Sequence, residues 1–176
     1  MKQSITMYPN KQLFEKAIPI PLDQINSATF SQIGSSMLDI LRKRGGIGLS
    51  ANQVGLPFNM CVIELTSSDP KIILNPRIIK QSEKRVKSKE GCLSLPGAGV
   101  IVSRHKDITV EYEDVNGKTV TEEATGLLSC CLQHEIDHLN GILMINRVNE
   151  YSRNKALKAV TGYKRSQARY ISLVKQ

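Results

Sequence analysis

Gln133-His134-Glu135-Ile136-Asp137-His138 is the stretch on which the fold and the chemistry of this chain depend. It contains the pattern HExxH, whose two histidines lie four residues apart. On a helix, side chains at this spacing share one face, so His134 and His138 can both bind a single metal ion. Glu135 lies one position further round the helix, where its carboxylate can take a proton from a bound water and pass it on. The motif therefore predicts a helix that carries a metal site.

The residues before the motif indicate that this helix is buried. Apolar side chains dominate Leu127-Leu128-Ser129-Cys130-Cys131-Leu132, and we expect the helix to extend over residues 126–140. Two histidines and two acids on a buried helix need polar partners, because an unpaired charge is costly to bury. A chance HExxH on a solvated helix would need no partners, so the apolar surroundings favour metal binding.

A catalytic metal site of this kind uses three protein ligands and leaves a fourth position for water. The sequence offers several candidates for the third ligand. A metzincin would have a histidine at position 144, where this chain has Met. Glu150 is a possible carboxylate ligand, although it lies in a basic segment. His105 lies between Arg104 and Lys106 and is expected at the surface.

The four cysteines complete the set of candidates. Cys130 and Cys131 precede His134 on the same helix, and we expect them to line the wall beside the site. Cys61 lies in an apolar run and is expected in the core. Cys92 differs, because it lies between a glycine and a Pro-Gly turn in the stretch EGCLSLPG. Backbone next to glycine can approach a metal closely, and a thiolate is a strong ligand for zinc or ferrous iron.

Outside this region the sequence predicts an α+β fold, with antiparallel sheets packed around the central helix that bears HExxH. A first helix is expected from Ser27 to the Gly45-Gly46 stop, because its apolar residues fall on one face. A basic C-terminal helix is expected from Tyr151 onward. Residues 1–26 are expected to form an irregular arm, and residues 81–90, QSEKRVKSKE, a charged loop. Strands are expected at 60–65, 71–79, 107–113 and 118–123, the last two joined by a hairpin at Asn116-Gly117.

Length and composition are those of one soluble globular domain. The chain has 176 residues, of which 40% are hydrophobic and 23% charged. It has no apolar run long enough to span a bilayer, and its first ten residues lack the core of a signal peptide. We therefore expect a cytoplasmic monomer that does not bind membranes and keeps its cysteines reduced. We expect residues 1–150 to form the catalytic part and residues 151–176 a basic helix of the same domain.

The net charge of +8 is concentrated near the C-terminus. Residues 147–176 contain eight Lys or Arg and one acid, whereas the preceding residues contain sixteen basic and fifteen acidic side chains. Such a stretch either forms a solvated face or docks on an anionic partner, such as RNA or an acidic protein surface.

Three motifs, in order along the chain, resemble those of the peptide deformylase family. Gly46-Ile47-Gly48-Leu49-Ser50-Ala51-Asn52-Gln53 is close to the family pattern GxGLAAxQ. Glu90-Gly91-Cys92-Leu93-Ser94 matches EGCLS in full, and Gln133–His138 matches QHExDH in full. The likeness extends over roughly residues 5–150. It implies a hydrolase that removes the formyl group from N-formylmethionyl nascent chains and releases formate.

The resemblance also implies a role for each motif residue. Cys92, His134 and His138 would hold the metal, and Glu135 would be the general acid and base. The Gln53 side-chain amide and the Leu93 backbone N–H would stabilise the oxyanion. The pocket for the methionine side chain would be formed by Ile47, Leu127, Cys130 and Cys131. At Gly48 and Gly91 the backbone would run close to the substrate or the metal. The family uses Fe²⁺, for which Zn²⁺, Ni²⁺ or Co²⁺ can substitute, and some members dock on the ribosome through a basic C-terminal helix.

This chain departs from the family pattern at several places, among them Phe14, which stands where an arginine is frequent and bears on packing only. Ser50 stands where Ala is usual, and Asn52 stands where Pro or Thr is common. We expect the changes at Ser50 and Asn52 to bear on peptide preference more than on the chemistry. Gly97-Ala98-Gly99 lacks a larger side chain that many members have there, which would weaken contacts to the second and third substrate residues.

Two other functions are compatible with parts of the sequence. A zincin-type peptidase would use His134, His138 and Glu150 as ligands. A nucleic-acid-binding module would hold a structural metal, but such sites have four protein ligands and no fourth ligand is evident. The segment GIGLSA also matches a dinucleotide fingerprint, but it lacks the preceding strand and following helix that this fingerprint requires.

Overall fold

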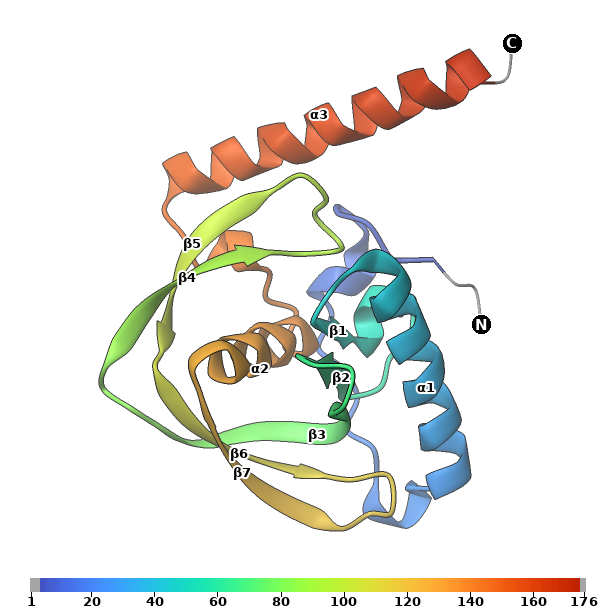
Figure 1. Cartoon of the computed structure of the whole chain (residues 1–176), viewed down its shortest axis with the longest axis vertical. Helices are drawn as coiled ribbons and strands as arrows, with labels where there is room; N and C mark the ends of the chain where they lie inside the picture. The colour runs from blue at the N-terminus through green and yellow to red at the C-terminus, as the bar shows by residue number, and fades with distance from the viewer. Residues whose placement is uncertain (1–3, 175–176) are drawn as a thin grey trace.

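The computed structural model describes residues 4–174, with residues 169–174 described as backbone only. It has the predicted α+β architecture, with a central helix α2 between two antiparallel sheets (Figure 1). The larger sheet has the strand order β1-β2-β3-β6-β7, and the smaller sheet pairs β4 with β5. The larger sheet comprises β1 (Gly48–Ser50), β2 (Met60–Glu64), β3 (Pro70–Gln81), β6 (Asp107–Glu113) and β7 (Thr119–Thr125). The other main elements are β4 (Arg85–Gly91), β5 (Gly99–His105), α1 (Ser27–Arg44), α2 (Gly126–Leu139) and α3 (Glu150–Val174).

Helix α1 begins and ends at residues suited to those positions. The side chain of Asn26 accepts hydrogen bonds from the backbone N–H groups of Ala28 and Thr29, which caps the first turn. At the other end Gly45 has a φ of 65°, a left-handed conformation that glycine adopts without strain. The helix buries Met37 and Leu41 completely, and α1 packs against the β1–β2 side of the larger sheet. The structure thus confirms the helix predicted over this segment.

Helix α2 is buried on most sides, as its apolar sequence predicts. It follows β7 directly and ends at Asn140, whose backbone N–H bonds to the last carbonyl oxygens. It packs against β1, β2 and β7 of the larger sheet and β5 of the smaller one. In Figure 1 it lies in the middle of the molecule, between the two sheets. The HExxH residues are therefore fixed on an element that the core holds in place.

The prediction of a charged loop over residues 81–90 was wrong. Residues 85–91 form β4, which pairs with β5 in continuous antiparallel register from Arg85↔His105 to Gly91↔Gly99. Lysine and arginine occupy the outward positions of β4, while the inward positions carry Val86, Ser88 and Glu90. The strand was missed because its inward side is largely polar, so the usual alternation of apolar and polar residues is absent. Strand β5 was not anticipated either.

The N-terminal arm is irregular apart from two short 3₁₀ turns, Lys11–Phe14 and Leu22–Gln24, and it passes directly beside the centre of the molecule. The backbone N–H of Thr6 donates to Gln53 O at 2.7 Å, and that of Tyr8 donates to Ser94 O at 3.0 Å. The arm thereby ties together two of the three motifs.

Helix α3 is packed against the body along its first half and exposed along its second. Ala156 and Val160 are buried and Leu157 partly buried in a cluster with residues of β5, whereas residues 161–168 are all exposed. Figure 1 shows the C-terminal half of this helix extending past the body. Tyr163 is 40% exposed, and the side chain of Tyr170 lies outside the described residues. Of the helices between residues 4 and 174, none is both long and apolar enough to cross a membrane.

Candidate metal centre

Cys92, His134 and His138 converge on one point between the two sheets. One ligand atom from each residue lies within 4.8 Å of the others, and Cys92 Sγ is 3.1 Å from His138 Nε2. The two histidines come from successive turns of α2, and Cys92 comes from the turn that follows β4. Two imidazoles and a thiolate form a donor set that suits Zn²⁺ or Fe²⁺. The cluster includes neither His105 nor Glu150, the other two candidates.

His134 is oriented by a carboxylate. Its Nδ1 is 2.9 Å from Glu90 Oε2, which leaves Nε2 available for a metal. Arg104 donates two hydrogen bonds to Glu90, at 2.8 and 3.0 Å, and one to Asp137 at 2.5 Å. Although burial opposes the charge of Glu90, hydrogen bonds from His134 and Arg104 lower its pKa to about 2. Arg147 completes the network with two bonds to Asp137, at 3.0 and 2.5 Å.

Sequence reasoning missed this network. Glu90 and Asp137 are both motif residues, but nothing in their spacing shows that a buried arginine joins them. The only signal was Arg104 at an inward position of an alternating strand, Gly99–His105.

His138 is suited to bind a metal as a neutral ligand. It is 1% exposed, and burial, together with the positive charge near His134 and Arg104, holds its pKa well below the usual value. Among the described atoms its Nδ1 has no hydrogen-bond partner, and its Nε2 faces Cys92. By contrast, burial raises the pKa of the Cys61 and Cys131 thiols, so these two cysteines stay protonated.

Glu135 lies beside the cluster and contacts β1. It is 3% exposed, and burial raises the pKa of its carboxyl, although the neighbouring His134 and a hydrogen bond from Ser50 oppose the shift. Gly48 allows this close approach of strand and helix. A Cβ atom at Gly48 would lie 2.5 Å from Glu135 Oε1 and 2.8 Å from Cys131 Sγ. No other residue fits at position 48 while this carboxylate stays where it is.

Gln53 directs a hydrogen-bond donor toward the cluster, and Leu93, next to Cys92 in the chain, has a backbone N–H that remains available. The backbone N–H of Ser50 donates to Gln53 Oε1 at 2.9 Å, which turns the amide nitrogen the other way. That nitrogen lies 3.5 Å from Cys92 Sγ and 3.1 Å from Ser94 Oγ. The backbone N–H of Leu93 has no acceptor among the described residues.

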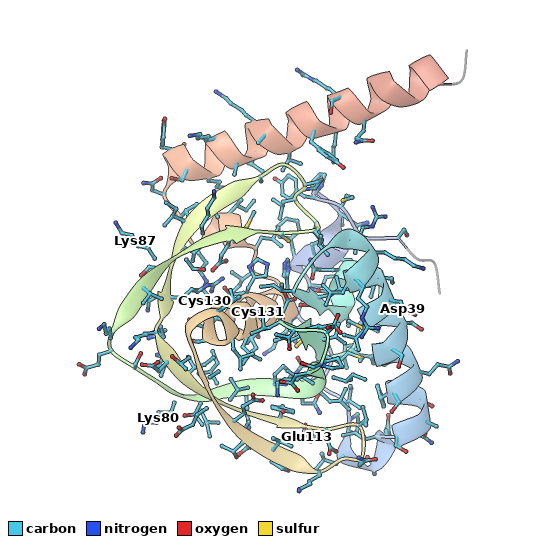
Figure 2. All side chains as sticks on the ribbon, viewed as in Figure 1. Asp39, Lys80, Lys87, Glu113, Cys130 and Cys131 are labelled. Atoms are coloured by element: carbon cyan, nitrogen blue, oxygen red, sulfur yellow. The ribbon has the colours of Figure 1, made fainter. Side chains whose placement is uncertain are left out.

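A cavity of about 710 Å³ opens from the cluster to the surface. Its wall includes Glu135, Gln53 and Leu93, together with all six residues predicted for substrate contacts: Ile47, Gly48, Gly91, Leu127, Cys130 and Cys131. Cys130 and Cys131 lie on α2 in the middle of the molecule (Figure 2). Ile47 and Leu127 are 39% and 59% exposed, so they lie at the mouth. Cys61 is buried in the core as expected, and His105 is half-buried, with its Nδ1 2.6 Å from Ser82 O.

Comparison with known proteins gives a consistent result. The family model described as Polypeptide deformylase matches residues 2–154. A peptide deformylase of Rhizobium meliloti is 38% identical over 150 residues, which cover 83% of this chain and 86% of the relative. One from Brucella suis is 43% identical over 131 residues, which cover 72% and 75%. The crystal structure of a peptide deformylase from Legionella pneumophila superposes with a TM-score of 0.87 at 33% identity, covering 94% of this chain and 97% of that one. With its fold, its three motifs and these relatives in agreement, the chain belongs to the peptide deformylase family of metal-dependent hydrolases, which remove the formyl group from the N-terminal methionine of nascent polypeptides.

Proposed function

We propose that this chain deformylates N-formylmethionyl peptides with a metal ion held by Cys92 Sγ and the imidazoles of His134 and His138. The observation that carries this assignment is the convergence of three ligand atoms within 4.8 Å of one another at the inner end of a 710 Å³ cavity. Two further contacts support it: Glu90 binds Nδ1 of His134 and so leaves Nε2 of that ring available, and Nε2 of His138 faces Cys92 Sγ at 3.1 Å.

The metal, when bound, supplies a Lewis acid that polarises the formyl carbonyl group and activates a water as nucleophile. Glu135 accepts the proton of that water on a carboxylate oxygen and delivers it to the amine nitrogen as the C–N bond breaks. The products are formate and a peptide with a free N-terminus. Ser50 holds the carboxylate at the cavity wall, and burial on α2 keeps competing water away from it.

Two donors meet the charge that develops on the formyl oxygen. Gln53 offers its Nε2, which the Ser50 backbone orients, and Leu93 offers a backbone N–H that has no acceptor among the described residues. Removing one such donor from an oxyanion site typically raises the barrier by about 3 kcal/mol.

The remaining wall residues bind the methionine and the peptide backbone. Ile47, Leu127, Cys130 and Cys131 form an apolar wall for the thioether side chain. Strands β1 and β4 each pair with only one neighbour within residues 4–174, so each has a free edge. Gly48 and Gly91 lie at the ends of these strands beside the cavity, where an extended substrate can hydrogen-bond to the backbone.

We infer Fe²⁺ as the ion in cells, with Zn²⁺, Ni²⁺ or Co²⁺ able to replace it. A thiolate at an open coordination position is oxidised readily, and so is ferrous iron. Protein prepared anaerobically with iron should release formate from formyl-Met-Ala-Ser and lose this activity in air, whereas the nickel form should persist. Absence of formate release from both forms would contradict the proposed function, and equal half-lives in air would count against Cys92 as a ligand of a redox-active metal.

We also propose that α3 docks the enzyme on ribosomes in the cytoplasm, near the exit of the nascent chain. Support comes from the exposed cations Arg153, Lys155, Lys158, Lys164 and Arg165 and from the exposed second half of the helix. The test should keep the helix, because truncation at Tyr151 would remove Ala156 and Val160 from the core.

Replacing Arg153, Lys155, Lys158 and Arg165 by Gln should therefore weaken co-sedimentation with ribosomes, most visibly at low salt. Turnover of formyl-Met-Ala-Ser should be unchanged. A matched variant removes four exposed lysines elsewhere, Lys16, Lys80, Lys84 and Lys118, and should bind ribosomes as the wild type does. Equal ribosome binding by the two variants would contradict docking through α3 and would mean that its basic side is only a solvated surface.

A further inference from the structure

The wall of the cavity also includes residues from both ends of the described chain. Ile5 and Met7 come from the N-terminal arm and Tyr163 comes from α3, with the 92–98 turn between them. None of these three residues belongs to a family motif or to the methionine wall. An extended peptide advances about 3.3 Å per residue, so the residues that follow the methionine lie successively farther from the cluster along the cavity.

Tyr163 reaches the cavity because Gly97 has no side chain. Gly97 has a φ of +79°, and a Cβ atom placed on it would lie 3.2 Å from Tyr163 Cβ and 3.4 Å from Ala159 O. Helix α3 therefore packs directly on the turn that carries Cys92. The absence of a larger side chain at residues 97–99 leaves room that the aromatic ring of the helix occupies.

A second contact fixes the helix beside the N-terminal arm. Lys164 Nζ donates to Tyr8 O at 2.5 Å, and the backbone N–H of Tyr8 donates to Ser94 O at 3.0 Å. The arm, the 92–98 turn and α3 are thus tied together at one edge of the cavity. Two large side chains remain accessible there, Met7 at 37% exposure and Tyr163 at 40%.

We propose that Met7 and Tyr163 form an apolar subsite for a side chain one or two residues after the formylmethionine. The subsite selects nascent chains with a large aliphatic or aromatic residue at this position, because such a side chain buries apolar surface against the exposed side chains of Met7 and Tyr163. Tyr163 is thereby a specificity-determining residue, contributed by the same helix that carries the basic surface. The inference rests on the proposed function, since it concerns the peptide that the cavity binds.

Kinetics with substrates of different length provide the first test. Tyr163→Ala should raise KM for formyl-Met-Leu-Phe about tenfold with little change in kcat, and should leave formyl-Met amide unaffected, because the amide does not reach the subsite. Tyr163→Phe should restore KM, and Tyr151→Ala, on a tyrosine of the same helix that is 78% exposed, should match the wild type. Unchanged KM for formyl-Met-Leu-Phe, or an equal change with the amide, would overturn the subsite.

A binding measurement that needs no turnover separates this inference from the proposed function. The chain contains no tryptophan, so Tyr163→Trp introduces a single indole at the subsite. Titration with the product peptide Met-Leu-Phe should shift its emission to the blue, and methionine amide should not. The same peptide should leave the emission of Tyr151→Trp unchanged. Absence of a shift at position 163, or the same shift at both positions, would overturn the subsite even if deformylation is normal.

Discussion

Ser50 donates its side-chain hydroxyl to a carboxylate oxygen of Glu135, and the same hydroxyl lies 3.2 Å from the backbone oxygen of Glu135. From the sequence we expected Ser50, which replaces a common alanine, to bear on peptide preference. In the structure Ser50 is not among the residues that line the cavity, and it contacts the proposed general base instead. Strand β1 can run this close to α2 because Gly48, on the same strand, has no side chain that would meet the Glu135 carboxylate. A small polar change in a motif thus contacts the residue proposed as general base.

Ser50→Ala should therefore lower kcat and leave KM nearly unchanged. Glu135 would keep its position on α2 but lose the contact that fixes its carboxylate, and a 1 Å misplacement of a reacting group can cost about a hundredfold in rate. Steady-state kinetics on formyl-Met-Ala-Ser measure the effect. Ser129→Ala removes a different buried hydroxyl, which bonds to His105 O, and should lose stability without losing kcat. Equal kcat in wild type and Ser50→Ala would show that Ser50 has no positioning role.

Glu135→Gln should retain one bound metal and lose nearly all deformylation. The carboxylate is proposed to carry every proton without being a ligand, and general acid–base catalysis typically contributes 10²–10⁴-fold. Metal content by atomic absorption and formate release by a coupled assay give the two quantities. Glu150→Gln, on an exposed carboxylate, should change neither of them. Turnover above about a tenth of wild type in Glu135→Gln would rule out the assigned role.

Cys92→Ser should bind metal weakly or not at all. A neutral hydroxyl replaces the thiolate, which is the only anionic donor of the cluster. Equilibrium dialysis against zinc measures the loss, with Cys130→Ala as a control that removes a thiol from the cavity wall but not from the cluster. A zincin-type peptidase would keep its metal in Cys92→Ser, so full retention would favour that alternative.

Arg104→Leu should destabilise the fold by about 3–5 kcal/mol, because it leaves two buried carboxylates without their shared partner. The Arg104 side chain is 4% exposed between Glu90 and Asp137. Arg77→Leu breaks an ion pair on an arginine that is 70% exposed and should cost less than about 1 kcal/mol. Urea unfolding of both variants provides the comparison. Similar losses would mean that the buried network contributes no more than a surface pair.

Tyr112→Phe should make stability less sensitive to alkaline pH. Burial, reinforced by the nearby charge of Glu122, raises the pKa of Tyr112 in the folded state. The unfolded tyrosine ionises near pH 10, as is usual for the free side chain, so the unfolded state loses its proton first. The contribution of Tyr112 is therefore complete below about pH 10 and is lost as the pH rises toward the folded pKa. The difference in unfolding free energy between the wild type and Tyr112→Phe should be largest and constant between pH 7 and 9 and should shrink above pH 10; a constant difference throughout would exclude this effect.

Local spacing was enough to predict the helices, and spacing together with the family resemblance pointed to the three residues that the structure brings together as a candidate metal cluster. The two histidines on α2 and the glycine-flanked Cys92 carry their chemistry in short motifs, and α1 carries its stop signal in Gly45. The network through Arg104 could not be predicted, because it depends on how β4 and β5 pair and on where α2 packs against them. Strand β4 was predicted as a loop because its inward side includes Glu90, a charged residue where a strand usually has an apolar one. The structure shows that this carboxylate contacts His134. The position of Tyr163 depends on a contact between residues 66 positions apart.

The fit around Gly48 bears on how resistance to an inhibitor could arise. An inhibitor that packs against this backbone would meet a surface that mutation can hardly alter, since any added Cβ atom would lie 2.5 Å from Glu135 Oε1. A substitution that excluded the drug would also displace the carboxylate that turnover is proposed to need. Ile47 and Leu127, half open to solvent at the cavity mouth, carry no such constraint, so escape variants should arise at these two positions and spare Gly48.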